Sequence, residues 1–244
     1  MKKMFMAVIA FMMTISASAQ FYIYYSDGTV AKVDSISMIA PNTGATGSEN
    51  GYEYIDLGLS VKWATCNVGA SSPEEYGDYF AWGEMQPKSN YDWSTYKWCN
   101  GSYDTPTKYC TNSMYGTVDN KTTLELSDDV ARANWGGSWR MPTDAELTEL
   151  REQCTWTWAA QNGVYGYKVT SKKSGYTNKS IFLPAAGYHG GSSLNLAGSY
   201  GDYWSSSLST DYPSDAFSLY FNSSNVDRDW SHRCYGLSVR PVCP

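Results

Sequence analysis

The chain has 244 residues, a formal net charge of −6 and only two histidines, while aromatic residues make up 16% of it. A chain of this length can bury a substantial core without a metal. Its acidic balance and unclustered basic residues exclude the phosphate-neutralising surface of a nucleic-acid-binding protein, so we expect no nucleic-acid partner.

Residues 1–19 have the pattern of a signal peptide. Lys2 and Lys3 precede an apolar run from Met4 to Ile15, and Ala17-Ser18-Ala19 supplies a small-residue cleavage site. The apolar run is about a dozen residues long, whereas a membrane span needs roughly twenty. We therefore expect an exported mature protein without a transmembrane segment, located in the periplasm, at the cell surface or in the medium.

Residues 20–41 are expected to form a small β-hairpin, because β-branched and aromatic runs lie on either side of Ser26-Asp27-Gly28. Residues 42–50 consist almost entirely of small, polar and turn-forming residues, which predicts a flexible linker. The main domain is then expected to span residues 51–244.

The first half of this domain is predicted to combine a few strands with long loops. Residues 52–65 indicate two strands with a turn at Gly58, and residues 71–123 are rich in the residues of ordered loops. A first helix is expected around residues 127–132, with Ser127 as its cap. A capping box at Thr143-Asp144-Ala145-Glu146 predicts a second helix over residues 144–153.

The second half, residues 164–242, alternates short apolar segments with Gly-, Ser- and Asn-rich turns, which predicts β structure. Phe217, Leu219 and Phe221 alternate with Ser218 and Tyr220, so one face of this strand is expected to pack on the core while the other stays available. The expected fold class is α+β, with short antiparallel strands, two short helices and long ordered loops.

Six cysteines in an exported protein are expected to pair. Six cysteines allow fifteen connectivities, of which Cys99–Cys110 is the easiest to close and Cys66–Cys154 is the second choice. No two cysteines have Cys-x-x-Cys spacing and histidines are scarce, so no zinc site and no other resident metal or cofactor is expected.

Four ordered blocks carry a resemblance to a known family. They are Tyr54–Ala64, Trp135–Glu146, Tyr203–Ser207 and Gly236–Val242. The second block resembles the Gly-x-Arg-Leu-Pro-Thr-x-x-Glu signature of formylglycine-generating-enzyme-like C-type-lectin folds. Together the blocks resemble the major paralogous domain family of Fibrobacter and Bacteroidetes, which implies a C-type-lectin-like domain over about residues 51–242.

Some members of that family resemble targets of diversity-generating retroelements, which rewrite a C-terminal region at template adenines. Rewriting an asparagine codon in this way never gives Lys, Glu, Gln, Met or Trp. Lys, Glu, Gln and Met together make up about one in seven of residues 21–199. None of the four occurs in residues 200–244, where about six would be expected at the same frequency. Residues 200–244 are therefore predicted to be a variable ligand-binding segment, in which Trp230 is an unvaried position or an argument against the scheme.

The side chains of this segment predict recognition, because Tyr and Trp give contact area and Ser and Asp give adaptable hydrogen bonds. Leu219, Phe221, Leu237 and Val239 are expected to form a hydrophobic floor beneath them. The predicted partner is an unidentified protein or glycan. The predicted ligand-binding residues are Asp211, Tyr212, Ser214, Asp215, Ser218, Tyr220, Asp227, Arg228, Asp229, Trp230, Ser231 and His232.

Three alternatives stay open on the sequence. Asp227 and Asp229 are a fragment of a calcium site, because calcium prefers oxygen ligands at such spacing. The signature shared with formylglycine-generating enzymes raises an enzymatic role, but Cys234 and Cys243 lack the surrounding catalytic motif, so no catalytic residue is predicted. A structural cell-surface or pilus-associated subunit is the third reading, in which the Ser- and Tyr-rich tail pairs with another chain and the hairpin of residues 20–41 matters most, because exposed strand edges invite strand addition.

Overall fold

A computed structural model of the protein describes residues 21–24, 30–33 and 46–244. The chain divides into two compact units, residues 1–42 and 43–244. In the first unit, β1 (Phe21–Tyr24) and β2 (Val30–Val33) pair antiparallel, with Phe21 opposite Val33, as the predicted hairpin requires. The predicted signal peptide and the turn at residues 26–28 lie outside the described residues.

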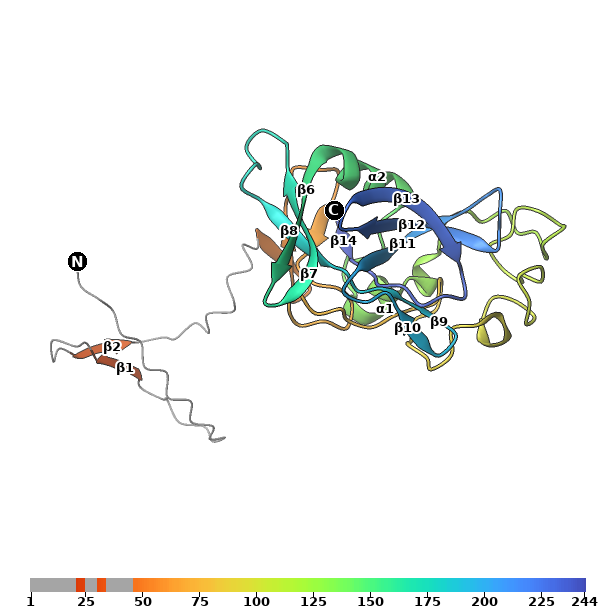
Figure 1. The fold of residues 1–244 in the computed structure, drawn as a ribbon, viewed down its shortest axis with the longest axis horizontal. Coiled ribbons are helices and arrows are strands. Elements are labelled where there is room, and N and C mark those ends of the chain that lie inside the picture. The colour runs from red at the N-terminus through yellow and green to blue at the C-terminus, as the bar shows by residue number, and fades with distance from the viewer. Residues whose placement is uncertain (1–20, 25–29, 34–45) are drawn as a thin grey trace. The chain divides into compact units, whose positions relative to one another are not determined.

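The second unit consists mainly of short antiparallel sheets (Figure 1). Its strands are β3 (Gly47–Glu49), β4 (Tyr52–Ile55), β5 (Lys62–Ala64), β6 (Cys154–Gln161), β7 (Val164–Ser171), β8 (Ser180–Pro184), β9 (Tyr188–Gly190), β10 (Ser193–Asn195), β11 (Tyr200–Leu208), β12 (Asp215–Asn222), β13 (Asn225–His232) and β14 (Val242–Cys243). The sheet orders are β14-β5-β4-β3, β6-β7-β8, β10-β9 and β11-β12-β13. Residues 71–123 are mostly irregular, as predicted, with the 3₁₀ turn η1 at Trp93–Thr95.

The predicted linker, residues 42–50, differs from the structure at its C-terminal end. Gly47–Glu49 form strand β3, which pairs with β4 at the edge of the first sheet. The Glu49 backbone carbonyl also accepts a 2.7 Å hydrogen bond from Trp139 Nε1, and its carboxylate accepts one from Ser138 N. A polar segment is ordered here because its backbone groups find partners, which its composition does not reveal.

The two α-helices begin at side-chain caps. α2 (Asp144–Gln153) has the predicted bounds and the complete capping box, with Thr143 and Glu146 each accepting a hydrogen bond from the other's backbone N–H. α1 (Val130–Trp135) begins later than predicted, because Asp129 and not Ser127 is its N-cap. Residues Leu126–Asp128 form the 3₁₀ turn η2 instead. No described helix is long and apolar enough to cross a membrane.

Helix α2 packs against one face of the C-terminal sheet. Leu147 and Leu150 of α2 share a buried cluster with Leu219 and Phe221 of β12. α2 contacts β11, β12 and β13, and Figure 1 shows it beside β13. The second unit is therefore an α+β arrangement of mainly antiparallel strands with two α-helices in its described part, as the sequence predicted at this coarser level.

A buried arginine connects three parts of this core. The Arg240 side chain is 1% exposed and donates hydrogen bonds of 2.9–3.1 Å to Asn67 Oδ1 and to the backbone carbonyls of Ala64, Thr65 and Phe182. These partners belong to the end of β5, to the loop after it and to β8. Because one guanidinium satisfies four acceptors, its burial is compatible with a stable core.

Candidate functional site

The predicted hydrophobic floor is buried but is divided between two core clusters, with Leu219 and Phe221 in one and Leu237 and Val239 in the other. Leu219, Phe221, Leu237 and Val239 are all buried, with at most 1% of each side chain exposed. Phe221 contacts the rings of Tyr203 and Tyr167, at centroid distances of 5.8 and 5.3 Å. The sheet β11-β12-β13 is therefore fixed to the core through alternate residues of its central strand.

The strand register separates the predicted ligand-binding residues onto two faces of this sheet. Tyr220 lies opposite Asp227, and Ser218 lies opposite Asp229, on the face opposite to that of Leu219 and Phe221. One end of this face is buried, because its Trp204 and Ala216 share a core cluster with Leu237 and Val239. We call the accessible part of it the Tyr220 face, which consists of Tyr200, Tyr220, Asn222, Asp227, Asp229 and Ser231. Tyr200 and Tyr220 have ring centroids 5.5 Å apart, so they form a continuous aromatic surface.

The other predicted residues of these strands lie at the end of the opposite face. Trp230 is 51% exposed and pairs with Phe217. The Arg228 guanidinium lies 3.7 Å from the Phe217 ring centroid and donates a 2.8 Å hydrogen bond to Asp144. His232 Nδ1 lies 2.6 Å from Asp215 Oδ1, and this carboxylate raises the pKa of His232.

Burial removes some predicted residues from any contact surface. Ser214 and Ser218 are 5% and 1% exposed, and Asp215 is 7% exposed beneath His232. Ser218 is buried because it sits on the middle strand of the sheet, between Trp204 of β11 and Asp229 of β13. Ser and Asp were expected at the surface from their polarity alone, which does not distinguish a central strand from an edge strand.

Asp211 and Tyr212 lie apart from both faces, in the loop between β11 and β12. They line a cavity of about 760 Å³ together with Thr210 and residues 111–115 and 118. Tyr212 and Met114 are exposed over 51% and 79% of their surface. This is an open, partly apolar hollow between two loops.

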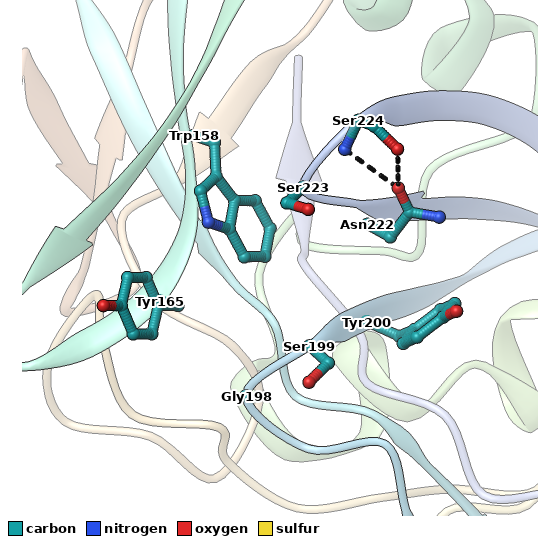
Figure 2. A pocket seen from close by; sticks show the side chains of 8 residues that line it. All are labelled: Trp158, Tyr165, Gly198, Ser199, Tyr200, Asn222, Ser223 and Ser224. Atoms are coloured by element: carbon teal, nitrogen blue, oxygen red, sulfur yellow. Dashed lines mark hydrogen bonds between the residues drawn. The ribbon is translucent and has the colours of Figure 1, made fainter.

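A second cavity, of about 420 Å³, lies where the Tyr220 face meets the β6–β7 hairpin (Figure 2). We call it the Trp158 pocket; its lining residues are Trp158, Tyr165, Gly198, Ser199, Tyr200, Asn222, Ser223 and Ser224. Tyr200 and Asn222 belong to both the pocket and the Tyr220 face. The two surfaces are therefore continuous.

Asn222 organises the wall of this pocket. Its Oδ1 accepts hydrogen bonds from Ser224 N and Ser224 Oγ, both at 2.9 Å, and from Asn225 N at 3.1 Å. Its Nδ2 donates a 2.8 Å hydrogen bond to the Tyr220 hydroxyl. The β12–β13 turn and the Tyr220 ring are thus held in place before any ligand arrives.

A buried carboxylate lies under the Tyr220 face. Asp202 of β11 pairs with Tyr220, and only 7% of its surface is exposed. Burial raises the pKa of Asp202 to about 7, and the nearby Asp229 carboxylate raises it further in the same direction. The charge of this face therefore changes near neutral pH.

The edge strand β13 has two of its backbone donors occupied by its own side chains. Asp227 Oδ1 accepts a 2.9 Å hydrogen bond from Arg228 N, and Asp229 Oδ1 accepts a 2.8 Å hydrogen bond from Trp230 N. Asp227 also forms a 2.6 Å ion pair with Arg151 of α2. Both carboxylates of the proposed calcium fragment are thus engaged by protein donors.

The described residues contain no group of three or more His, Cys, Asp or Glu side chains that could hold a metal ion. All six cysteines are unpaired in the structure, so neither Cys99–Cys110 nor Cys66–Cys154 is formed. Cys66 packs against one core cluster and Cys154 lies in another. The sequence does not show which cluster each cysteine joins, so it could not exclude this pair. Burial raises the pKa of Cys154 to about 11 and that of Cys234 to about 12, so neither is an activated thiol.

Sequence reasoning did not include the residues of the Trp158 pocket that precede residue 200. The sequence feature that could have indicated them is a pair of aromatic-rich segments, residues 156–158 and 165–167, which lie on the two strands of one hairpin. Comparison of the chain with protein-family models, with curated proteins and with solved structures gives no match.

Proposed function

We propose that the protein is an exported, non-catalytic binding protein that recognises its ligand through the C-terminal sheet. One observation carries the proposal: the Tyr220 face presents aromatic, hydroxyl, amide and carboxylate groups at the accessible end of a sheet whose Leu219 and Phe221, on the other face, are anchored in the core. Such a surface can change its contacts without changing the floor beneath it. Rigid support under adaptable polar and aromatic side chains is what recognition surfaces require.

The proposal includes the family resemblance. A C-type-lectin-like domain of the Fibrobacter and Bacteroidetes paralogous family, with a segment diversified over residues 200–244, is compatible with an α+β unit whose last residues form this sheet and then strand β14. Sequencing the DNA beside the gene tests the diversification. A reverse-transcriptase gene and a near-copy of the codons for about residues 203–242, differing only at adenines, supports it; their absence removes the genetic part and leaves the binding surface.

Binding is tested with the mature protein on a printed array of purified bacterial surface proteins and oligosaccharides. We expect capture of a defined subset, and Tyr220→Ala should weaken that capture about tenfold, as truncation of a central aromatic contact does. Tyr103→Ala is the matched control, because Tyr103 is 54% exposed in a distant part of the sequence. Equal loss in both variants, or none in either, contradicts the proposal.

A second candidate, a structural subunit, is favoured by the division of the chain into two compact units, the first of which holds the β1–β2 hairpin. Deleting residues 20–42 removes the hairpin and keeps β3 in its sheet. If assembly into higher oligomers fails while array binding persists, the hairpin is a docking element. Unchanged assembly and unchanged binding identify it as a spacer.

A further inference from the structure

We propose that the Trp158 pocket is a subsite for a neutral saccharide. This inference deepens the proposed function and rests on it, because the pocket continues the Tyr220 face through Tyr200 and Asn222. It assigns a ligand class to residues outside the predicted set. The argument comes from the shape of the aromatic wall, the free hydroxyls of the facing wall and the absence of charge between them.

The aromatic wall is a flat platform. Trp158 and Tyr165 lie on the same side of the β6–β7 hairpin, and their rings are 7° from parallel with centroids 6.2 Å apart. Figure 2 shows both ring faces turned in the same direction. Tyr167 and Phe221 contact the Trp158 ring at 5.2 and 6.4 Å, which holds the platform in position.

A flat aromatic platform matches one face of a pyranose ring. The C–H bonds on that face carry small positive charge, and the π-system above an aromatic ring carries negative charge, so the two attract. Stacking also removes the apolar sugar face and the ring from water. The hydroxyls at the sugar's rim remain outside the stack and need hydrogen-bonding partners.

The facing wall supplies such partners. Ser199 and Ser223 are exposed at the pocket, and within the described residues their hydroxyls take part in no other hydrogen bond (Figure 2). Each hydroxyl can donate and accept, which suits a ligand whose own hydroxyls do both. Gly198 adds no side chain to this wall, and its φ of +82° disfavours a residue that would add one.

The charge of the lining restricts the ligand class. No Asp, Glu, Lys or Arg is among the residues that form the pocket. An anionic or cationic ligand would lose hydration here without gaining a charged partner. A neutral hexose or N-acetylhexosamine unit loses less, and its hydroxyls replace water at the serines.

The test is calorimetric titration of the mature protein with neutral oligosaccharides of glucose, galactose, mannose and N-acetylglucosamine, in EDTA. We expect at least one to bind, and Tyr165→Ala to weaken it about tenfold, while Tyr165→Phe keeps the ring and retains binding. Tyr165 is 53% exposed, so its truncation should leave the fold intact, which thermal unfolding verifies. Ser199→Ala combined with Ser223→Ala should also weaken binding.

Three outcomes overturn the inference: no neutral sugar binds, sugar binding needs calcium, or Tyr165→Ala binds the sugar as well as the unchanged protein. Capture of a protein ligand that depends on Tyr165 also overturns it. The array experiment separates this failure from that of the proposed function. If Tyr220→Ala abolishes capture of some other array ligand while the pocket binds no sugar, only the saccharide inference fails.

Discussion

Replacing Asp202 by Asn tests the electrostatics under the Tyr220 face. The carboxyl is 7% exposed, and burial together with Asp229 raises its pKa from an ordinary value of 3.8 to about 7. The unfolded chain therefore releases this proton near pH 4, whereas the folded protein holds it until about pH 7. Between these values the folded state binds more protons than the unfolded state, so the Asp202 contribution to stability falls as pH rises.

The size of the effect follows from the shift. A difference of about three pKa units corresponds to about 4 kcal/mol, an upper bound because partial solvent access and local relaxation reduce it. Asp202→Asn removes the ionisation and keeps the side-chain shape. Relative to the unchanged protein, the variant should gain a few kcal/mol of unfolding free energy at pH 8, and most of this gain should be absent at pH 4.

Urea unfolding of both proteins at intervals between pH 4 and pH 8 measures the difference. Asp211→Asn is the control, because Asp211 is exposed and its replacement should give a small difference. A stability difference between Asp202→Asn and the unchanged protein that stays constant from pH 4 to pH 8 would refute the reasoning. So would a variant that is less stable at pH 8 than at pH 4 relative to the unchanged protein.

Three further outcomes are expected. Arg240→Lys should lower the unfolding free energy by about 3 kcal/mol, because an ammonium cannot reproduce the forked hydrogen bonds of the buried guanidinium; urea unfolding measures it. Thr143→Ala should cost about 1 kcal/mol through loss of the α2 cap, read from the same assay. Oxidation with glutathione disulfide should join Cys99 to Cys234, which share a core cluster, in preference to Cys110; non-reducing peptide mapping identifies the bond, and a Cys99–Cys110 peptide would contradict it.

The elements that could be predicted from sequence depend on local chemistry. The capping box at Thr143 fixes the start of α2, and the alternation of Phe217, Leu219 and Phe221 predicts a strand with a floor side. The start of α1 could not be predicted in this way, because Ser127 and Asp129 are both good caps. Asp129 is the cap in the structure, where one of its carboxylate oxygens accepts a hydrogen bond from Ala131 N at the start of the helix. The second oxygen accepts a hydrogen bond from Met141 N, in a segment that the local pattern does not include.

The candidate site could be predicted only in part, because it depends on contacts between distant segments. The alternation in β12 indicates which residues share a face but not that Ser218 is covered, since that depends on the strands at both its sides. The Trp158 pocket combines a hairpin near residue 160 with a turn near residue 223. No local pattern relates these two segments, and their meeting is set by packing around Phe221.

The carboxylates of Asp227 and Asp229 also affect how copies of the protein behave when crowded. They occupy Arg228 N and Trp230 N, donors that a strand from a neighbouring molecule would need in order to extend the sheet. Two such edges would also bring four negative side chains together. The edge strand β13 can therefore stay exposed without pairing with the same strand of another copy.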